Sequence, residues 1–336
     1  MSSSSPTSLL NIDNIDVRPG KPPMLRVDAT DDAPRWAAEH RDALRAAVTE
    51  HGSLLVRGLG LREPAETEAV FRELGTLMTE KEAFAERHVY AQGVYSASKW
   101  PPNQPMCVHH ELSYAVEFPS LMLFACLTAA TRGGATPVAD AAAVLEALPA
   151  ALVERFERVG WLLVRNYNDD IGASVAEAFG TEDRGVVERY CRANAIKFEW
   201  RPDGALRTWQ RRSALVRHPL TGHRSWFNQA AFLSEWTMNS EVREYLVDEY
   251  GEDGLPFNTR FGDGDPIGAD VVELINGEYE ANTVRAPWEP GDLLLVDNIR
   301  MAHGREPFEG RREIVVGLSD PVRLSNCSPT IDVAGG

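Results

Sequence analysis

The fold is decided by residues 291–312, which read GDLLLVDNIRMAHGREPFEGRR. A Pro-Gly turn precedes four consecutive aliphatic residues, and this order predicts a strand over 292–298. His303 follows that strand, and Arg305, Arg311 and Arg312 come after it. The stretch therefore joins a predicted strand to an imidazole that could bind a metal and to guanidinium groups that could bind an anion.

Outward from this stretch, apolar runs bounded by Gly, Pro, Asn or Asp predict further strands at 53–59, 121–127, 161–167, 214–219, 283–288 and 313–320. Helical spacing of apolar residues predicts helices over 34–50, 64–78 and 141–158, the last of them broken at Pro149. The rest is expected to be strand-like, except that 168–212 show no assignable pattern. We therefore expect a mainly β protein with helical additions and a double-stranded β-helix (jelly-roll) core.

The predicted domain organisation is simple. Residues 1–8 are rich in Ser, Pro and Thr, so 1–25 are expected to form a flexible N-terminal segment. No repeat or low-complexity linker interrupts the rest, which predicts one domain with helical insertions over 26–324 and a C-terminal tail over 325–336. The four cysteines are scattered without a C-x-x-C pair, and three of them are expected to be buried free thiols.

The charge balance excludes some partners. The chain carries 34 Lys+Arg against 50 Asp+Glu, a formal net charge of −16. Nucleic acid and anionic membrane surfaces are held largely by Lys and Arg, so neither is expected to bind. The N-terminus has neither the basic nor the apolar part of a secretory signal, and no run is long enough to span a membrane, so we expect a cytoplasmic protein. The oligomeric state is not indicated.

Residues 106–114, MCVHHELSY, contain an H-x-E pattern. Side chains alternate between faces along a strand, so His109 and Glu111 are predicted to point one way and His110 the other. Together with His303 they would form a site of two imidazoles and one carboxylate with open coordination positions. Such a site suits Fe(II) that also binds a chelating cosubstrate and O2. Zinc in a hydrolase is equally compatible with these residue types.

Three motifs in order make the pattern more specific. The chain has H-x-E, then G-G-x-T-P-x-x-D, then G-D-x-x-x-x-D-N-x-x-x-x-H-G-R-x-P-F-x-G-x-R. This resembles the taurine/2,4-D dioxygenase superfamily, from about Leu54 to about Asp320. Within it, the pattern is most similar to the branch of clavaminate synthase and the aspartyl hydroxylases of peptide-antibiotic (syringomycin-type) pathways. The resemblance implies an oxygenase that uses Fe(II), 2-oxoglutarate and O2, with His109, Glu111 and His303 as metal ligands.

The resemblance also implies how 2-oxoglutarate is held. Thr136, in the Gly-Gly-x-Thr motif, matches the threonine that hydrogen-bonds a carboxylate of 2-oxoglutarate. Arg312 matches the arginine that pairs with the far carboxylate, a task for which a planar guanidinium offers two parallel donors. The spacing from His303 is shorter than in the taurine branch, so Arg305 and Arg311 stay as alternatives to Arg312. Many relatives have Asn in place of His110, and strand alternation selects His109 as the ligand.

The substrate is only broadly indicated. Halogenating members of the superfamily lack the carboxylate ligand, so Glu111 favours hydroxylation or a related oxidation. By resemblance, the substrate is expected to be amino-acid-like, either free or tethered to a carrier protein. Ser96, Tyr114 and Asn228 are candidate substrate contacts.

Two functions are alternatives to an oxygenase: a redox-inactive metal-binding jelly-roll protein (a zinc hydrolase or sensor) and a carrier-binding pseudoenzyme. Thr136 and Arg312 disfavour the first alternative, and the complete ligand set disfavours the second.

Overall fold

The computed structural model describes residues 15–28, 30–84, 87–168 and 170–332. Within these residues the largest sheet has seven strands, in the order β1-β2-β16-β6-β19-β4-β3. Only the β1–β2 pair is parallel; the other pairs run antiparallel. In sheet order, the strands span Met24–Arg26, Ser53–Arg57, Leu293–Asp297, Glu117–Thr128, Glu313–Arg323, Val94–Ser96 and Val89–Ala91.

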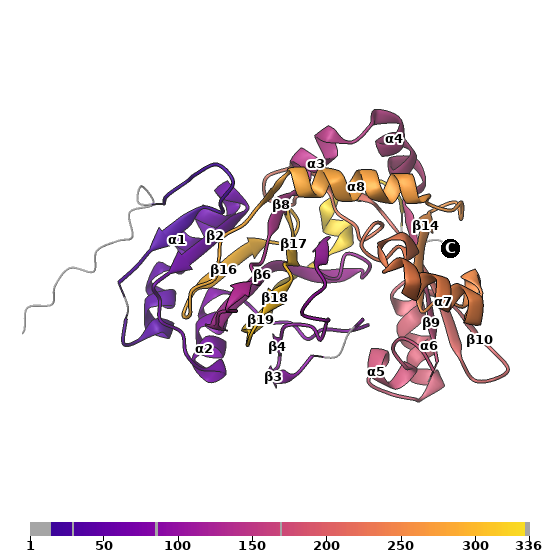
Figure 1. Cartoon of the computed structure of the whole chain (residues 1–336), viewed down its shortest axis with the longest axis horizontal. Helices are drawn as coiled ribbons and strands as arrows, with labels where there is room; N and C mark the ends of the chain where they lie inside the picture. Colours follow the sequence, from indigo (N-terminus) through magenta and orange to yellow (C-terminus); the bar gives the residue numbers. More distant parts are fainter. Residues whose placement is uncertain (1–14, 29, 85–86, 169, 333–336) are drawn as a thin grey trace, which may run out of the picture.

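Helices α1 (Ala33–His51) and α2 (Pro64–Leu74) cover one face of this sheet, at the left of Figure 1. The central strands bury both faces because their apolar residues are consecutive. In β16, Leu293 and Leu295 pack against the two helices, whereas Leu294 and Val296 point into the main core on the other side. The aliphatic run that predicted this strand is therefore explained by burial between two layers.

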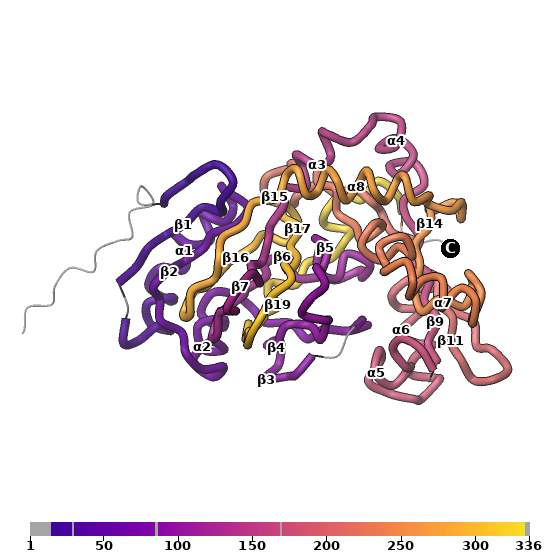
Figure 2. The backbone as a smooth tube through the Cα atoms, viewed as in Figure 1, coloured from indigo at the N-terminus to yellow at the C-terminus, as the bar shows by residue number. Residues whose placement is uncertain are grey.

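A second sheet lies across the main core. It has the order β15-β8-β17-β5, and its strands span Thr283–Val284, Val138–Asp140, Met301–Arg305 and Met106–His109. Apolar residues of both sheets share one cluster, which α3 (Ala141–Ala147) and α8 (Ala269–Ala281) also join. The tube view shows β5 and β17 side by side near the middle of the molecule (Figure 2).

A third sheet, with the order β10-β11-β9-β14, lies at the right of Figure 1. Its strands span Lys197–Trp200, Leu206–Arg212, Trp161–Tyr167 and Phe257–Phe261. Helices α5 (Val175–Phe179) and α6 (Arg184–Ala193) accompany it and share a small apolar cluster with it. We call this sheet with α5 and α6 the second lobe. It includes most of the stretch 168–212, in which no secondary structure was predicted.

Several predicted elements need correction. The helix expected over 64–78 ends at Leu74, because Gly75 is extended and lies against Ser319 too closely for a side chain. The break at Pro149 is present, with α4 spanning Ala150–Val159. The strand expected over 283–288 is only two residues long. Helices α7 (Ser240–Tyr250) and α8 were missed, since that part of the chain was expected to be strand-like.

The remaining elements are short. Strands β12 (Leu215–Arg217) and β13 (Arg224–Trp226) form one hairpin, and β7 (Arg132–Gly133) pairs with β18 (Phe308–Glu309). The 3-10 turns span Glu235–Thr237, Glu252–Gly254 and Leu324–Cys327. Across the part of the chain that the structure describes, no helix has the length and apolar character needed to cross a membrane.

The two ends of the chain are only partly described. Residues 1–14 of the expected flexible segment lie outside the described residues, and Asp16 exchanges two backbone hydrogen bonds with Met24. Of the expected tail, 333–336 lie outside the described residues. Cys327 and Ile331 are buried, and the Thr330 amide donates to Ser213 Oγ at 2.8 Å, so 325–332 pack against the body. All four cysteines are free, and Cys126, Cys191 and Cys327 are buried as expected.

Candidate metal centre and substrate cavity

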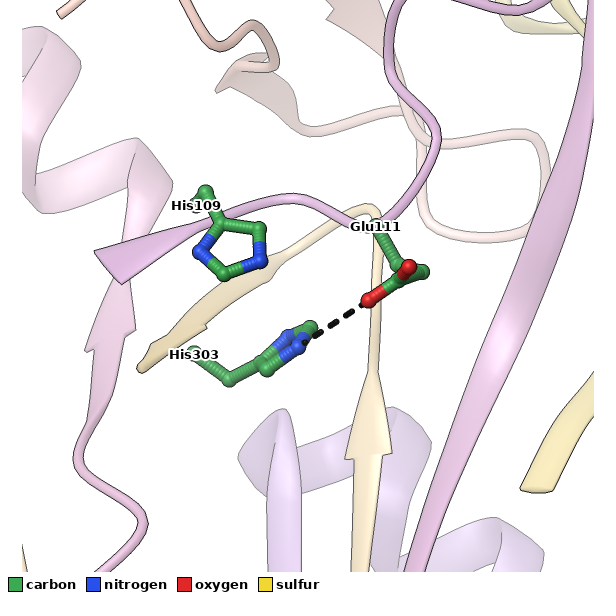
Figure 3. Close-up of side chains that lie close together, drawn as sticks. All are labelled: His109, Glu111 and His303. Atoms are coloured by element: carbon green, nitrogen blue, oxygen red, sulfur yellow. Dashed lines mark ion pairs between the residues drawn. The ribbon is translucent and has the colours of Figure 1, made fainter. Parts of the chain in front are cut away.

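The two histidines of the predicted site are cross-strand neighbours. His109 ends β5, and it lies directly opposite His303 of β17 in the antiparallel register. Their ring centroids are 4.9 Å apart, and Figure 3 shows both rings and the Glu111 carboxylate turned toward one another. One ligand atom from each of the three residues lies within 4.8 Å of the others. Strand pairing thus brings together residues that are far apart in the sequence.

Glu111 is positioned by Asn298. The Asn298 side chain accepts from the Glu111 amide at 2.8 Å and donates to the Glu111 carbonyl at 3.0 Å. Strand β5 ends at His109, so Glu111 lies in the following turn and the strand alternation used to place it does not extend that far. His110 still points away from the triad, with Nδ1 donating to the Asn298 carbonyl at 2.6 Å. Glu111 therefore faces the two histidines as expected, but the turn after β5 and the two hydrogen bonds of the Asn298 side chain (the Asn298 clamp) place it there.

The site is electrostatically arranged for a cation. His109 Nδ1 lies 2.9 Å from the Cys107 carbonyl, which can only accept, so Nδ1 carries the proton and Nε2 keeps its lone pair. Burial, aided by His303, lowers the pKa of His109 to about 3, so the ring is neutral at neutral pH. Burial alone would raise the pKa of Glu111, but Arg87 and the two histidines outweigh it and keep the carboxyl ionised.

These residues fit a divalent metal. His303 Nε2 and Glu111 Oε2 are 3.5 Å apart, and a neutral imidazole nitrogen and a carboxylate oxygen can both bind a cation. His303 Nδ1 is also buried without a hydrogen-bond partner among the described residues. Two imidazoles and one carboxylate are the donor set of non-haem Fe(II) sites with open positions. A cation between the three side chains would satisfy the converging lone pairs.

A small cavity of about 50 Å³ joins the triad to the predicted cosubstrate residues. His109, Glu111, His303, Thr136 and Arg312 all line it. Arg312 Nε donates to the Gly134 carbonyl at 2.8 Å, and its Nη2 lies 3.4 Å from Thr136 Oγ1. Among the described residues Arg312 has no carboxylate partner. Burial and nearby Arg305 lower its pKa to about 10, which leaves the guanidinium charged and available to an anion.

Both alternative arginines are paired with other groups, although Arg305 also lines the small cavity. Arg305 donates to the carbonyls of Trp100, Pro101 and Gln104 at 2.7–3.0 Å and so holds that loop. Arg311 has a side chain that is 79% exposed and pairs with Glu313. The geometry therefore favours Arg312 as the anion-binding residue over both of them.

A larger cavity of about 500 Å³ opens from the other side of His109 and Glu111. Its walls are mainly apolar, and they come from the loops before and after β3 and β4 and from the segment 229–257. Phe232 stacks on the His109 ring at 4.1 Å between centroids. Cavities of this size, with a few polar groups at one end, are typical of small-molecule sites.

The three candidate substrate contacts have different places. Tyr114 lines the larger cavity, although its hydroxyl donates to the Glu82 carbonyl. Ser96 lines neither cavity; its hydroxyl accepts from the His88 amide. Asn228 also lines neither, and its side chain holds the Ala214 carbonyl and the Ala230 amide. Its neighbour Gln229 lines the larger cavity, and the contact of Asn228 with substrate stays a prediction.

Sequence reasoning missed two side chains at the centre. Arg87 donates to Glu111 Oε1 at 3.0 Å, but nothing in its surrounding sequence indicates that the loop folds back onto the triad. Asn298 belongs to the D-N motif, so a signal was present for it, although its role as a clamp on Glu111 was not evident.

The comparisons with known proteins agree with this geometry. Residues 16–318 match the taurine catabolism dioxygenase TauD, TfdA family. The dapdiamide synthesis protein DdaC of Enterobacter agglomerans is 37% identical over 280 residues, covering 82% of this chain and 84% of the relative. A clavaminate synthase-like protein of Arabidopsis thaliana is 28% identical over 288 residues, covering 82% and 83%.

Solved structures share the fold at low sequence identity. A taurine dioxygenase from Burkholderia xenovorans superposes with a TM-score of 0.50 at 18% identity, covering 93% of this chain and 92% of the other. PvcB of Pseudomonas aeruginosa also gives 0.50, at 14% identity, with 93% and 90% covered. The match over most of its length shows that this chain belongs to the TauD/TfdA family and is a dioxygenase that works with Fe(II) and 2-oxoglutarate.

Proposed function

We propose that this dioxygenase hydroxylates an unactivated C–H bond of an amino-acid-like small molecule in specialised metabolism. Fe(II) would be held by His109, Glu111 and His303, and 2-oxoglutarate by Thr136 and Arg312. The observation that carries this proposal is the single small cavity lined by all five residues. A metal site without redox chemistry, such as that of a zinc hydrolase, does not require a partly buried guanidinium without a carboxylate partner beside the ligands.

The residues of the chain have separable tasks in this proposal. Bound Fe(II), with 2-oxoglutarate and O2, supplies the oxidising chemistry. Arg312 neutralises the far carboxylate of 2-oxoglutarate, and its bond to the Gly134 carbonyl fixes the plane of the guanidinium. Glu111 supplies the only anionic ligand, and Asn298 fixes its backbone. Phe232 covers one face of His109 and excludes water from that side.

The relatives support the metabolic setting. The Enterobacter agglomerans relative acts in dapdiamide synthesis, and the Arabidopsis thaliana relative is clavaminate synthase-like. We place this chain in the synthesis of a comparable small molecule. We also propose that the jelly-roll core consists of the seven-stranded sheet and the β15-β8-β17-β5 sheet, which face each other across the main core. This core would belong to one domain over 26–324.

Metal and cosubstrate binding can be tested without knowing the substrate. Metal-free protein should bind one Fe(II), and adding 2-oxoglutarate without O2 should give a weak visible metal-to-ligand absorption. Tight stoichiometric zinc, with no such absorption after reconstitution in iron, would contradict the proposal. After aerobic turnover, mass spectrometry of a panel of free and carrier-tethered amino acids should show a gain of one oxygen in the substrate.

A further inference from the structure

Arg87 stands at the junction of the two cavities. It lines both the small cavity with the metal ligands and the larger apolar cavity. Among the described residues that line the larger cavity, it is the only Lys or Arg. Its side chain is 11% exposed. A guanidinium beside the metal ligands in an otherwise apolar cavity favours a ligand that places an anionic or hydrogen-bond-accepting group next to it.

The hydrogen bonds of Arg87 leave part of its guanidinium unused. Nε donates to Ser98 Oγ at 2.9 Å, and Nη2 donates to Glu111 Oε1 at 3.0 Å. Nη1 is buried and has no acceptor among the described residues. Buried donors are ordinarily paired, so this N–H group needs a partner that the chain itself does not supply. Glu80 is the other nearby carboxylate; its ion pair is with Nε, at 3.7 Å, and it does not hydrogen-bond Nη1.

The second lobe holds residues 82–84, which precede Arg87 in the chain. Arg165 of β9 donates to the carbonyls of Glu82 and Ala83 at 2.9 and 3.0 Å. Its guanidinium also lies 3.6 Å from the centre of the Phe84 ring. The Glu82 carboxylate accepts from Tyr190 and Gln210 of the same lobe. These contacts hold residues 82–84, and the Arg87 side chain is itself held by Ser98 and Glu111, as a preorganised binding group requires.

We propose that Arg87 binds a free carboxylate of the primary substrate through its unpaired Nη1. This rests on the proposed function and narrows its substrate class to molecules with a free carboxylate and an apolar body. A guanidinium pairs well with the two oxygens of a carboxylate, whereas an ester, thioester or amide offers one weaker acceptor. The substrate is then bound free, and not through its carboxyl group to a carrier protein. Its carbons next to the carboxylate lie nearest the metal ligands.

Binding by the Fe(II) protein with 2-oxoglutarate, without O2, tests this directly. The probes are L-leucine, L-phenylalanine and their N-acetyl derivatives, each as free acid and as carboxamide, followed by the change in the visible absorption. We expect at least one free acid to bind the wild-type protein at least tenfold more tightly than its carboxamide. Arg87→Gln should remove this difference, and Arg311→Gln, a matched change of an exposed arginine, should retain it.

The outcomes separate the two proposals. Carboxamides that bind as tightly as acids, as a carrier-tethered substrate would predict, overturn the role of Arg87 while leaving the oxygenase intact. The same conclusion follows if no acid perturbs the absorption, or if the preference survives in Arg87→Gln. Because the acid-to-amide comparison uses the wild-type protein, it decides the matter even if Arg87→Gln folds poorly. Absence of the absorption before any probe is added refutes the proposed function itself, and with it this inference.

Discussion

The two cavities that meet at Glu111 are built from different kinds of structure. The small one is lined mainly by residues of β5, β6, β17 and β19, such as His109, Phe124 and His303. The large one is lined mainly by loops, by the turn before α7 and by α7 itself. The pairing of strands fixes His109 and His303, and a turn and two loops carry Glu111, Thr136 and Arg312. The substrate cavity is shaped mostly by chain segments outside the sheets. Substitutions of residues that line only one of the two cavities should therefore leave the other cavity largely unaffected.

Glu111→Ala should have the largest effect, because Glu111 belongs to both cavities and is the only anionic ligand. We expect succinate formation from 2-oxoglutarate to fall by more than the roughly 10–100-fold typical of residues that only support a ligand. Circular dichroism should show the fold intact. His110→Asn is the control and should be tolerated, since His110 points away from the triad. Near-normal turnover by Glu111→Ala would mean that another carboxylate binds the metal.

Arg312→Ala tests the small cavity alone. Truncating one partner of a buried charge pair costs about 2–5 kcal/mol, a loss of roughly thirty-fold to several thousand-fold in affinity for 2-oxoglutarate. Fe(II) binding should change little, because Arg312 does not contact the three ligands. Titration of the visible absorption with 2-oxoglutarate measures the loss. If Arg305→Ala or Arg311→Ala carries the defect and Arg312→Ala does not, the assignment from the C-terminal motif is wrong.

Asn298→Ala should weaken Fe(II) binding by about 10–100-fold, because outer groups that orient a ligand typically have effects of that size. Asn228→Ala is a matched control: Asn228 is also buried and holds backbone groups, but it does not contact a ligand. Both variants should lower the melting temperature, and only Asn298→Ala should lower iron affinity. Equal iron affinity in the two variants would show that the clamp on Glu111 has no role in metal binding.

The smallest effect is expected from Leu246→Ala in the large cavity. Leu246 lines that cavity, and its neighbour Val247 on the same helix does not. Losing apolar contacts of this size should raise the KM for the substrate by about tenfold, without changing the affinity for 2-oxoglutarate. Val247→Ala should change neither value. A loss of 2-oxoglutarate affinity in Leu246→Ala would show that the two cavities are coupled.

The residues that sequence could identify are those inside contiguous motifs. His109, Glu111, Thr136, His303 and Arg312 were found in this way, and the structure brings all five to one cavity. The central strands were predictable because burial on both faces requires unbroken apolar runs.

Strand β9 of the second lobe was predicted over 161–167, but the part of the lobe within 168–212 was not predictable, because its residues form no such runs. Its strand β11 (Leu206–Arg212) includes buried Arg212, which donates to the carbonyls of Tyr114, Asn194 and Ala195. The Arg212 guanidinium is buried because these carbonyls accept its hydrogen bonds. A charged residue at a buried position interrupts the apolar pattern by which a strand is predicted from sequence. Arg87 was missed for a similar reason, since its contact with Glu111 depends on a loop held by Arg165.

The hydrogen bonds from Arg165 to this loop have an evolutionary consequence. Substitutions in the second lobe can shift Phe84 and Arg87 without touching the paired strands that hold His109 and His303. Related proteins could therefore acquire new substrates through substitutions in the second lobe while they retain the same metal ligands and oxidation chemistry. Divergence in this family should then accumulate faster in the lobe and in the loop over 79–88 than in β5 and β17.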